Sequence, residues 1–190
     1  PTGVSFGTTT ANSIELNATG TLTNLTLGRS GTYFDSTTSG GDSGIREWVQ
    51  TTTDTATPLT PDTNYTFRVG ARNQDAVVTL YSGTASQRTL AAVPAVPTLS
   101  DPTINSMKLD VNANGNPATT VFAIQCLATN PADANWNGKY VDAAGNPWAT
   151  EIWQPDGAWA IITIHGLMSD TTYTFAVKAR NGDSLPTAFG

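Results

Sequence analysis

The side chains that could carry out acid, base or nucleophile chemistry are few and far apart in this sequence. There is one histidine, His165, and one cysteine, Cys126. His165 alternates with apolar neighbours, which predicts a place on the solvent side of a strand, and no second histidine exists to complete a metal site or a base–nucleophile pair. Cys126 alternates with Phe122 and Ile124, which predicts a buried thiol, and it has no partner for a disulfide within the chain.

The carboxylates form no catalytic pattern. Fifteen Asp and Glu residues are scattered along the chain, and only a deep cleft could pair two of them for glycoside hydrolysis. The motifs of phosphate-binding loops, zinc sites and nucleophile elbows are absent. We therefore expect no enzyme activity and no cofactor.

Two short segments leave one alternative open. Residues 112–116, NANGN, and 142–146, DAAGN, place oxygen ligands close together near glycines, as in a structural calcium site. Neither segment matches an EF-hand loop, and ordinary turn chemistry explains both of them equally well.

Three tryptophans are the candidate binding residues. Trp136, Trp148 and Trp159 have no counterpart in the first half of the chain, and Trp136 lies in a polar stretch, NWNG. An exposed indole could stack on a sugar ring or on a partner protein. The alternative is structural, with Trp159 covering the edge of its own sheet and Trp136 packing under a long loop.

The elements that must position these residues are β-strands. Short segments of alternating apolar and polar residues, bounded by Gly, Pro, Asn and Asp, recur throughout the chain. In residues 65–71, YTFRVGA, every second side chain is apolar, and residues 173–179, YTFAVKA, repeat the pattern. The sequence predicts an all-β fold in which these side chains face the core: Tyr65, Phe67, Val69, Ala71, Tyr173, Phe175, Val177 and Ala179.

The chain repeats itself once. LTPDTNYTFRVGARN at 59–73 returns as LMSDTTYTFAVKARN at 167–181, and NSIEL at 12–16 returns as NSMKL at 105–109. We infer two modules, 1–91 and 92–190, with an insertion between Cys126 and Lys139 in the second. The first module continues into a last strand near 80–90, whereas the last strand of the second is predicted to be incomplete. The proline-containing segment 91–97 makes a short, semi-rigid join.

Composition narrows the choice of partners. The net charge is −6 and there are only three lysines, so a phosphate backbone would be repelled and we expect no nucleic-acid binding. No long apolar segment and no signal-like start is present, so we expect no membrane insertion, and the start at Pro1 suggests a piece of a longer protein. We expect a monomer.

The repeated segment resembles a motif of a known family. Leu-x-Pro-x-Thr-x-Tyr followed by alternating apolar residues and Ala-Arg-Asn is similar to the E–F corner and F strand of fibronectin type III domains, a family of immunoglobulin-like β-sandwiches. By this resemblance, Tyr65 and Tyr173 are corner tyrosines whose hydroxyls return to the backbone upstream. Leu59 and Leu167 are the leucines that fill the core beside them.

One departure from that family concerns the core. Its members usually carry a tryptophan late in strand B, where this chain has Ala18 and Val111. Trp48 and Trp153, which occur at similar places in the two modules, are the predicted substitutes in the core.

The resemblance also implies a function. The composition is rich in Thr, Asn and Gly and allows no disulfide within the chain. This composition, together with segments such as TYTFAVKARNGD, resembles modules of bacterial extracellular proteins. It implies a secreted or cell-surface spacer that holds neighbouring domains of the same polypeptide, as in a polysaccharide-degrading enzyme such as a cellulase. Two alternatives remain: a module that binds carbohydrate or protein through exposed tryptophans, and a repeat segment of a surface-layer protein or adhesin.

Overall fold

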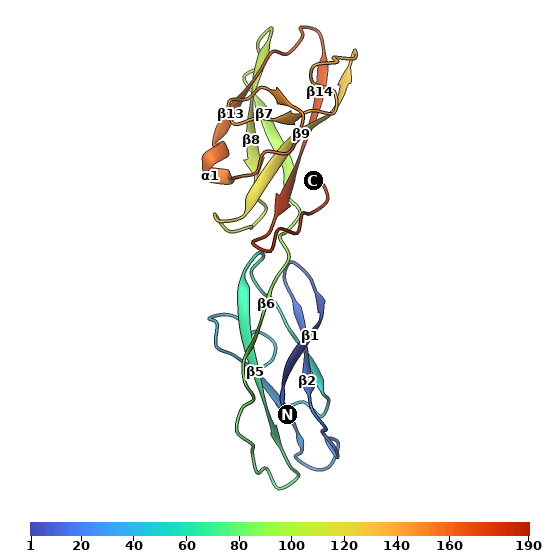
Figure 1. Cartoon of the computed structure of the whole chain (residues 1–190), viewed down its shortest axis with the longest axis vertical. Helices are drawn as coiled ribbons and strands as arrows, with labels where there is room; N and C mark the ends of the chain where they lie inside the picture. The colour runs from blue at the N-terminus through green and yellow to red at the C-terminus, as the bar shows by residue number, and fades with distance from the viewer. The chain divides into compact units, whose positions relative to one another are not determined.

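The computed structural model describes residues 1–190, and these form two compact units, Pro1–Leu90 and Ala91–Gly190. Each unit contains two antiparallel sheets that enclose a core of its own (Figure 1). The predicted all-β class is confirmed, since the only helix has four residues. No helix in the chain is long and apolar enough to cross a bilayer.

Unit 1 is a sandwich of two three-stranded sheets. One sheet has the order β1-β2-β4 and the other β3-β5-β6. Their strands are β1 (Gly3–Thr9), β2 (Ile14–Thr19), β3 (Gly31–Ser36), β4 (Thr53–Ala56), β5 (Asn64–Arg72) and β6 (Ala85–Arg88). The alternation of β5 points its apolar side chains inward, where they meet the buried residues of the opposite sheet, Val4, Ile14, Leu16 and Ala56.

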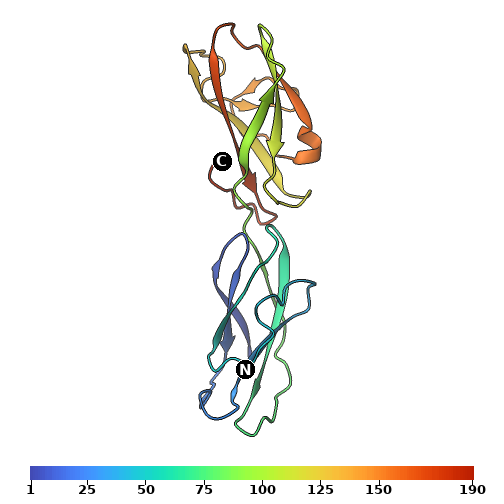
Figure 2. The ribbon, with the colours of Figure 1, turned by 180° about the vertical axis from the view of Figure 1, so that it is seen from behind.

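Unit 2 repeats this design and extends it. Its smaller sheet has the order β13-β8-β7, formed by β7 (Ala95–Ser100), β8 (Ser106–Asn112) and β13 (Ile161–His165). In the larger sheet, β9 (Val121–Asn130) pairs along its length with β14 (Thr172–Arg180). The other edge of β9 pairs with β10 (Tyr140–Val141) and β12 (Gln154–Pro155), and β11 (Pro147–Trp148) pairs with β10. The short helix α1 (Asp156–Trp159) leads into β13, and Figure 2 shows the same strands from behind.

The asparagine of each Ala-Arg-Asn phrase builds the turn that follows β5 or β14. The Oδ1 atom of Asn73 accepts the backbone N–H groups two and four residues further on, at 3.0 and 2.9 Å. Asn181 does the same at 3.2 and 2.9 Å. This repeated asparagine is therefore a turn residue, because its side chain replaces backbone acceptors.

The segment after each turn begins in the same way in both units. Thr79 accepts the N–H of Ala71 through its hydroxyl at 3.1 Å, and Thr187 accepts that of Ala179 at 3.0 Å. In unit 1 the segment continues into β6, and in unit 2 it pairs with β14 as far as Gly190.

Candidate functional site

Two of the three candidate tryptophans lie inside unit 2. Trp136 is fully buried, and its Nε1–H donates to the carbonyl of His165 at 3.0 Å. Trp159 is 2 % exposed, and its Nε1–H donates to the carbonyl of Phe122 at 2.9 Å. The hypothesis that these rings bind a ligand is corrected here, because neither presents a face to solvent. Both fill the core, and each satisfies its one polar atom there.

The third candidate, Trp148, is different. It lies on β11 at the edge of the larger sheet, and 51 % of its surface is exposed. Its ring makes no stacking, cation–π or hydrogen-bonding contact within the chain. Each of the other four tryptophans makes at least one such contact.

The prediction that Trp48 and Trp153 fill the core is wrong. Both are half-buried and lie outside the two core clusters. Arg72 stacks on Trp48, with Cζ 4.4 Å from the ring centroid, and Arg180 stacks on Trp153 at 4.5 Å. The two arginines alternate with the inward side chains of β5 and β14, so they face outward and hold the indoles on the outer face of the sheet.

In unit 2 the stacked tryptophan belongs to a larger group, which we call the hairpin face: Tyr140, Trp148, Glu151, Trp153 and Arg180. The β10–β11 hairpin pairs Tyr140 with Trp148, so both side chains lie on one side of the sheet. The Glu151 carboxylate accepts the Trp153 Nε1–H at 3.1 Å and the Tyr140 hydroxyl at 3.3 Å. A shallow depression lies between the aromatic rings and is lined by Tyr140, Ala149, Thr150, Glu151 and Trp153.

A lysine completes the electrostatics of this face. The ammonium of Lys178 forms an ion pair with Glu151 and lies 5.0 to 5.6 Å from the centroids of the Tyr140, Trp153 and Phe189 rings. The hydrogen bond from Lys178 is the main reason why the pKa of Glu151 is lowered. The carboxylate is therefore ionised at neutral pH and acts only as a hydrogen-bond acceptor.

Unit 1 has the same stack without the hairpin. Tyr33 lies 5.4 Å from Trp48, centroid to centroid, and Arg72 stacks on the same indole. Tyr81 stacks with Arg68 in the same unit, with the Arg68 Cζ 4.1 Å from the ring centroid. The stack is thus common to both units, and the exposed aromatic hairpin belongs to unit 2.

The corner tyrosines lie at the starts of β5 and β14, just after the chain crosses from one sheet of each sandwich to the other. The Tyr65 hydroxyl accepts the backbone N–H of Thr60 at 2.9 Å, and that of Tyr173 accepts the N–H of Met168 at 2.7 Å. The two leucines that precede them, Leu59 and Leu167, are buried in their respective cores.

A residue that the sequence did not single out joins the second corner. Asp133, from the insertion, is 1 % exposed, and its Oδ2 accepts the Tyr173 hydroxyl at 2.7 Å. Burial raises the pKa of Tyr173, and the hydrogen bond to Asp133 adds to the effect. No periodicity marks Asp133, because its partner lies forty residues away along the chain.

The lone cysteine and histidine lie where the alternation predicted. Cys126 is fully buried, and burial raises the pKa of its thiol to about 11, so it holds no reactive thiolate at neutral pH. His165 is exposed at the end of β13. Both predictions are confirmed.

The two oxygen-rich loops use their side chains to hold the backbone. The Asp142 Oδ1 accepts the N–H groups of Ala144 and Asn146 at 2.9 and 2.8 Å, which shapes the β10–β11 turn. Asn116 binds the backbone of Ala92 with both its oxygen and its nitrogen. Nowhere in the chain do three or more His, Cys, Asp or Glu side chains gather in a way that could hold a metal ion.

A cleft of about 710 Å³ lies in unit 1 between the loop after β2 and the loop after β5. Among the residues that line it, only Arg72 and Asp75 carry charge. The cleft therefore holds no pair of carboxylates, and no histidine or cysteine lines it.

Comparison with known proteins supports the fold. No protein-family model and no curated protein sequence matches the chain. A solved two-domain fibronectin type III segment of chicken tenascin is similar in structure, with a TM-score of 0.55 and 14% sequence identity. The similarity covers 100% of this chain and 97% of that segment. The chain therefore has the fold of two fibronectin type III-like sandwiches in tandem.

Proposed function

We propose that the chain is a non-catalytic spacer pair of a secreted multidomain protein, a monomer that positions neighbouring domains of the same polypeptide. The parent that we propose is a bacterial polysaccharide-degrading enzyme such as a cellulase. Fibronectin type III domains are often structural or linker modules, but a fold by itself does not establish a function. The observation that carries the proposal is how the chain is held where the two units join.

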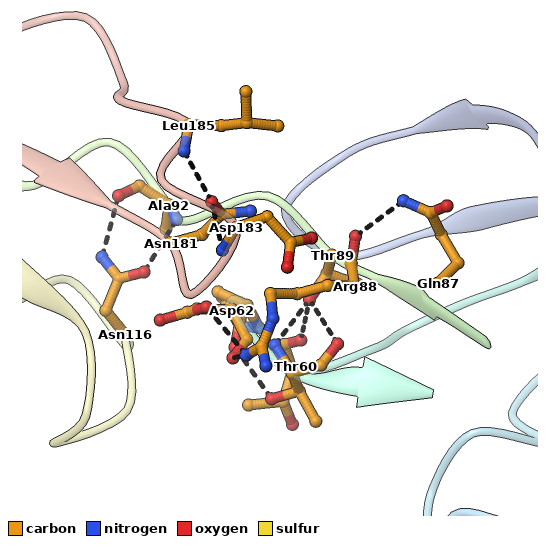
Figure 3. A network of polar contacts seen from close by, with 12 residues as sticks. Thr60, Asp62, Gln87, Arg88, Thr89, Ala92, Asn116, Asn181, Asp183 and Leu185 are labelled. Carbon is orange, nitrogen blue, oxygen red and sulfur yellow. Dashed lines mark hydrogen bonds and ion pairs between the residues drawn. The ribbon is translucent and has the colours of Figure 1, made fainter. Parts of the chain in front are cut away.

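Unit 1 holds its last residues firmly. Thr89 is fully buried, and its hydroxyl donates to Thr60 O at 2.8 Å and accepts the N–H of Thr63 at 3.0 Å. The N–H of Leu90 donates to Thr10 O, also at 3.0 Å. Arg88 donates to the carbonyl and the carboxylate of Asp62 at 2.9 and 3.1 Å (Figure 3).

Unit 2 holds its first residues equally well. Ala91 is buried in the core of unit 2. Asn116 Oδ1 accepts the N–H of Ala92, and its Nδ2 donates to the carbonyl of the same residue, both at 2.8 Å (Figure 3). A flexible linker consists of residues without such contacts, whereas here Leu90 and Ala91 are consecutive and each is held. This supports a spacer of restricted flexibility.

The spacer proposal is tested by pulsed electron paramagnetic resonance. Spin labels are placed on two exposed positions, Ser5→Cys in β1 and Thr174→Cys in β14, while the buried Cys126 stays unlabelled. We expect a narrow distribution of label distances in the parent chain and a broader one after Asn116→Ala. Asn146→Ala is the control, because the side chain of Asn146 makes no hydrogen bond. A broad distribution in the parent chain would contradict the spacer role.

A further inference from the structure

Trp148 is the one tryptophan whose position is explained neither by full burial nor by a specific contact of its ring. About half of its surface meets water, and that half gains none of the free energy of burial. Its position is nevertheless fixed, because the turn of its hairpin is held by Asp142 and by Gly145. An exposed aromatic side chain on a well-held stretch of backbone is a common feature of binding surfaces.

The neighbours of Trp148 extend the aromatic surface across the sheet. Tyr140 pairs with Trp148 on one side and with Gln125 of β9 on the other. Gln154 pairs with Phe122 of β9. Trp153 precedes Gln154 in the chain, so it lies beside β9 at a point two residues from Gln125. Three aromatic side chains therefore follow one another on the outer face at the spacings of a sheet.

Polar groups of two kinds accompany these rings. Glu151 offers an ionised carboxylate whose side chain is partly open to solvent. Arg180 is fixed by its stack on Trp153, and its guanidinium forms no hydrogen bond or ion pair in the chain. The hairpin face thus presents flat apolar surfaces, an acceptor and an oriented set of donors.

We propose that the hairpin face binds an uncharged polysaccharide chain. The C–H faces of sugar rings would stack on Trp148 and Tyr140, since C–H groups are attracted to the negative face of an aromatic ring. Sugar hydroxyls would pair with Glu151 and Arg180. An extended chain suits a row of rings, because successive sugars can occupy successive aromatic positions.

Two observations favour this ligand over others. The net charge of −6 opposes an acidic polymer. A protein partner needs about 800 Å² of surface with a largely uncharged centre, whereas Glu151, Lys178 and Arg180 lie among the rings of this face.

Unit 1 provides the internal comparison. It has the Trp48–Arg72 stack, but no counterpart of the β10–β11 hairpin or of Trp148. Binding is therefore assigned to unit 2, as a role in addition to that of a spacer. The two experiments separate the two roles. A spacer that binds no polysaccharide would fail only the binding assay, and a binding module with flexibly joined units would fail only the distance measurement.

The test uses the whole chain, mixed with insoluble cellulose, xylan or chitin and measured by depletion from solution. We expect retention on at least one polysaccharide, and an affinity at least tenfold lower for Trp148→Ala. Tyr81→Ala removes an exposed aromatic side chain from unit 1 and is the matched control, with unchanged retention expected. Circular dichroism checks that each variant is folded, and Trp148→Phe, which keeps a ring, should retain part of the affinity.

Three results would overturn the inference. These are no retention on any of the three polysaccharides, retention of Trp148→Ala equal to that of the parent, and equal losses in Trp148→Ala and Tyr81→Ala.

Discussion

The two corner tyrosines occupy equivalent positions but have different partners. The hydroxyl of Tyr65 makes one hydrogen bond, to a backbone N–H. That of Tyr173 makes two, one of them to the buried carboxylate of Asp133. The same residue type therefore contributes differently to the stability of each unit, because a hydrogen bond to a charged group is stronger than one to a neutral group.

Removing these hydroxyls measures that difference. Tyr173→Phe leaves a buried Asp133 oxygen without its donor, so we expect the free energy of unfolding of unit 2 to fall by about 2 to 3 kcal/mol. Tyr65→Phe is the matched variant, and we expect a loss of about 1 kcal/mol in unit 1. Chemical denaturation of both variants gives the comparison. Equal losses would show that Asp133 adds nothing to the corner.

Among the elements, the β10–β11 hairpin depends on the conformation of one residue. Gly145 has φ of +83°, in the region that favours glycine, and a Cβ there would meet the carbonyl oxygen of Thr163. Only glycine lets the turn approach β13 this closely, and the backbone N–H of His165 donates to the Gly145 carbonyl at 2.9 Å. This contact fixes the hairpin, and with it Trp148, against the sandwich.

We therefore expect Gly145→Ala to destabilise unit 2 by roughly 2 kcal/mol or more, since both φ and the close approach oppose a side chain. Gly138→Ala is the control, because Gly138 also has a positive φ, +75°, but has open space where its Cβ would lie. Its cost should be about 1 kcal/mol. Thermal unfolding distinguishes the two, and the close approach would be refuted if Gly138→Ala were as costly as Gly145→Ala.

At the scale of the whole molecule, each unit has a complete core of its own. The core cluster of unit 1 contains no residue of unit 2, and the reverse also holds. Cooperative unfolding is a property of a single core, so a chain with two cores contains two potential cooperative units.

We expect residues 1–90, expressed alone, to fold and to unfold cooperatively. In calorimetry of the full chain, Tyr173→Phe should move only one of two transitions, and Tyr65→Phe only the other. A failure of residues 1–90 to fold, or a single transition that both variants move as a whole, would contradict the independence of the cores.

The sequence by itself determined where the main strands lie, which of their side chains face the core, and that the chain contains two copies of one unit. Alternation placed Tyr65, Phe67 and Val69 in one core and Cys126 in the other, because side chains of a strand point to opposite faces in turn. Alternation also placed His165 on the solvent side of its strand. The face on which a strand residue lies depends on its immediate neighbours in the sequence, so the sequence was sufficient to assign it.

Only the tertiary structure decided what each tryptophan does. Trp136 lies among polar residues in the sequence and Trp159 among small and apolar ones, yet both are buried. The sequence favours a core position for Trp48 and Trp153, yet both stack on outward-facing arginines. The reason is that these four side chains lie in or beside loops, where no period links sequence position to face. Their environment is set by partners 24 to 39 residues away, such as Arg72, Phe175 and Phe122. The same holds for Asp133, whose role exists only because the insertion returns to the corner of its own sandwich.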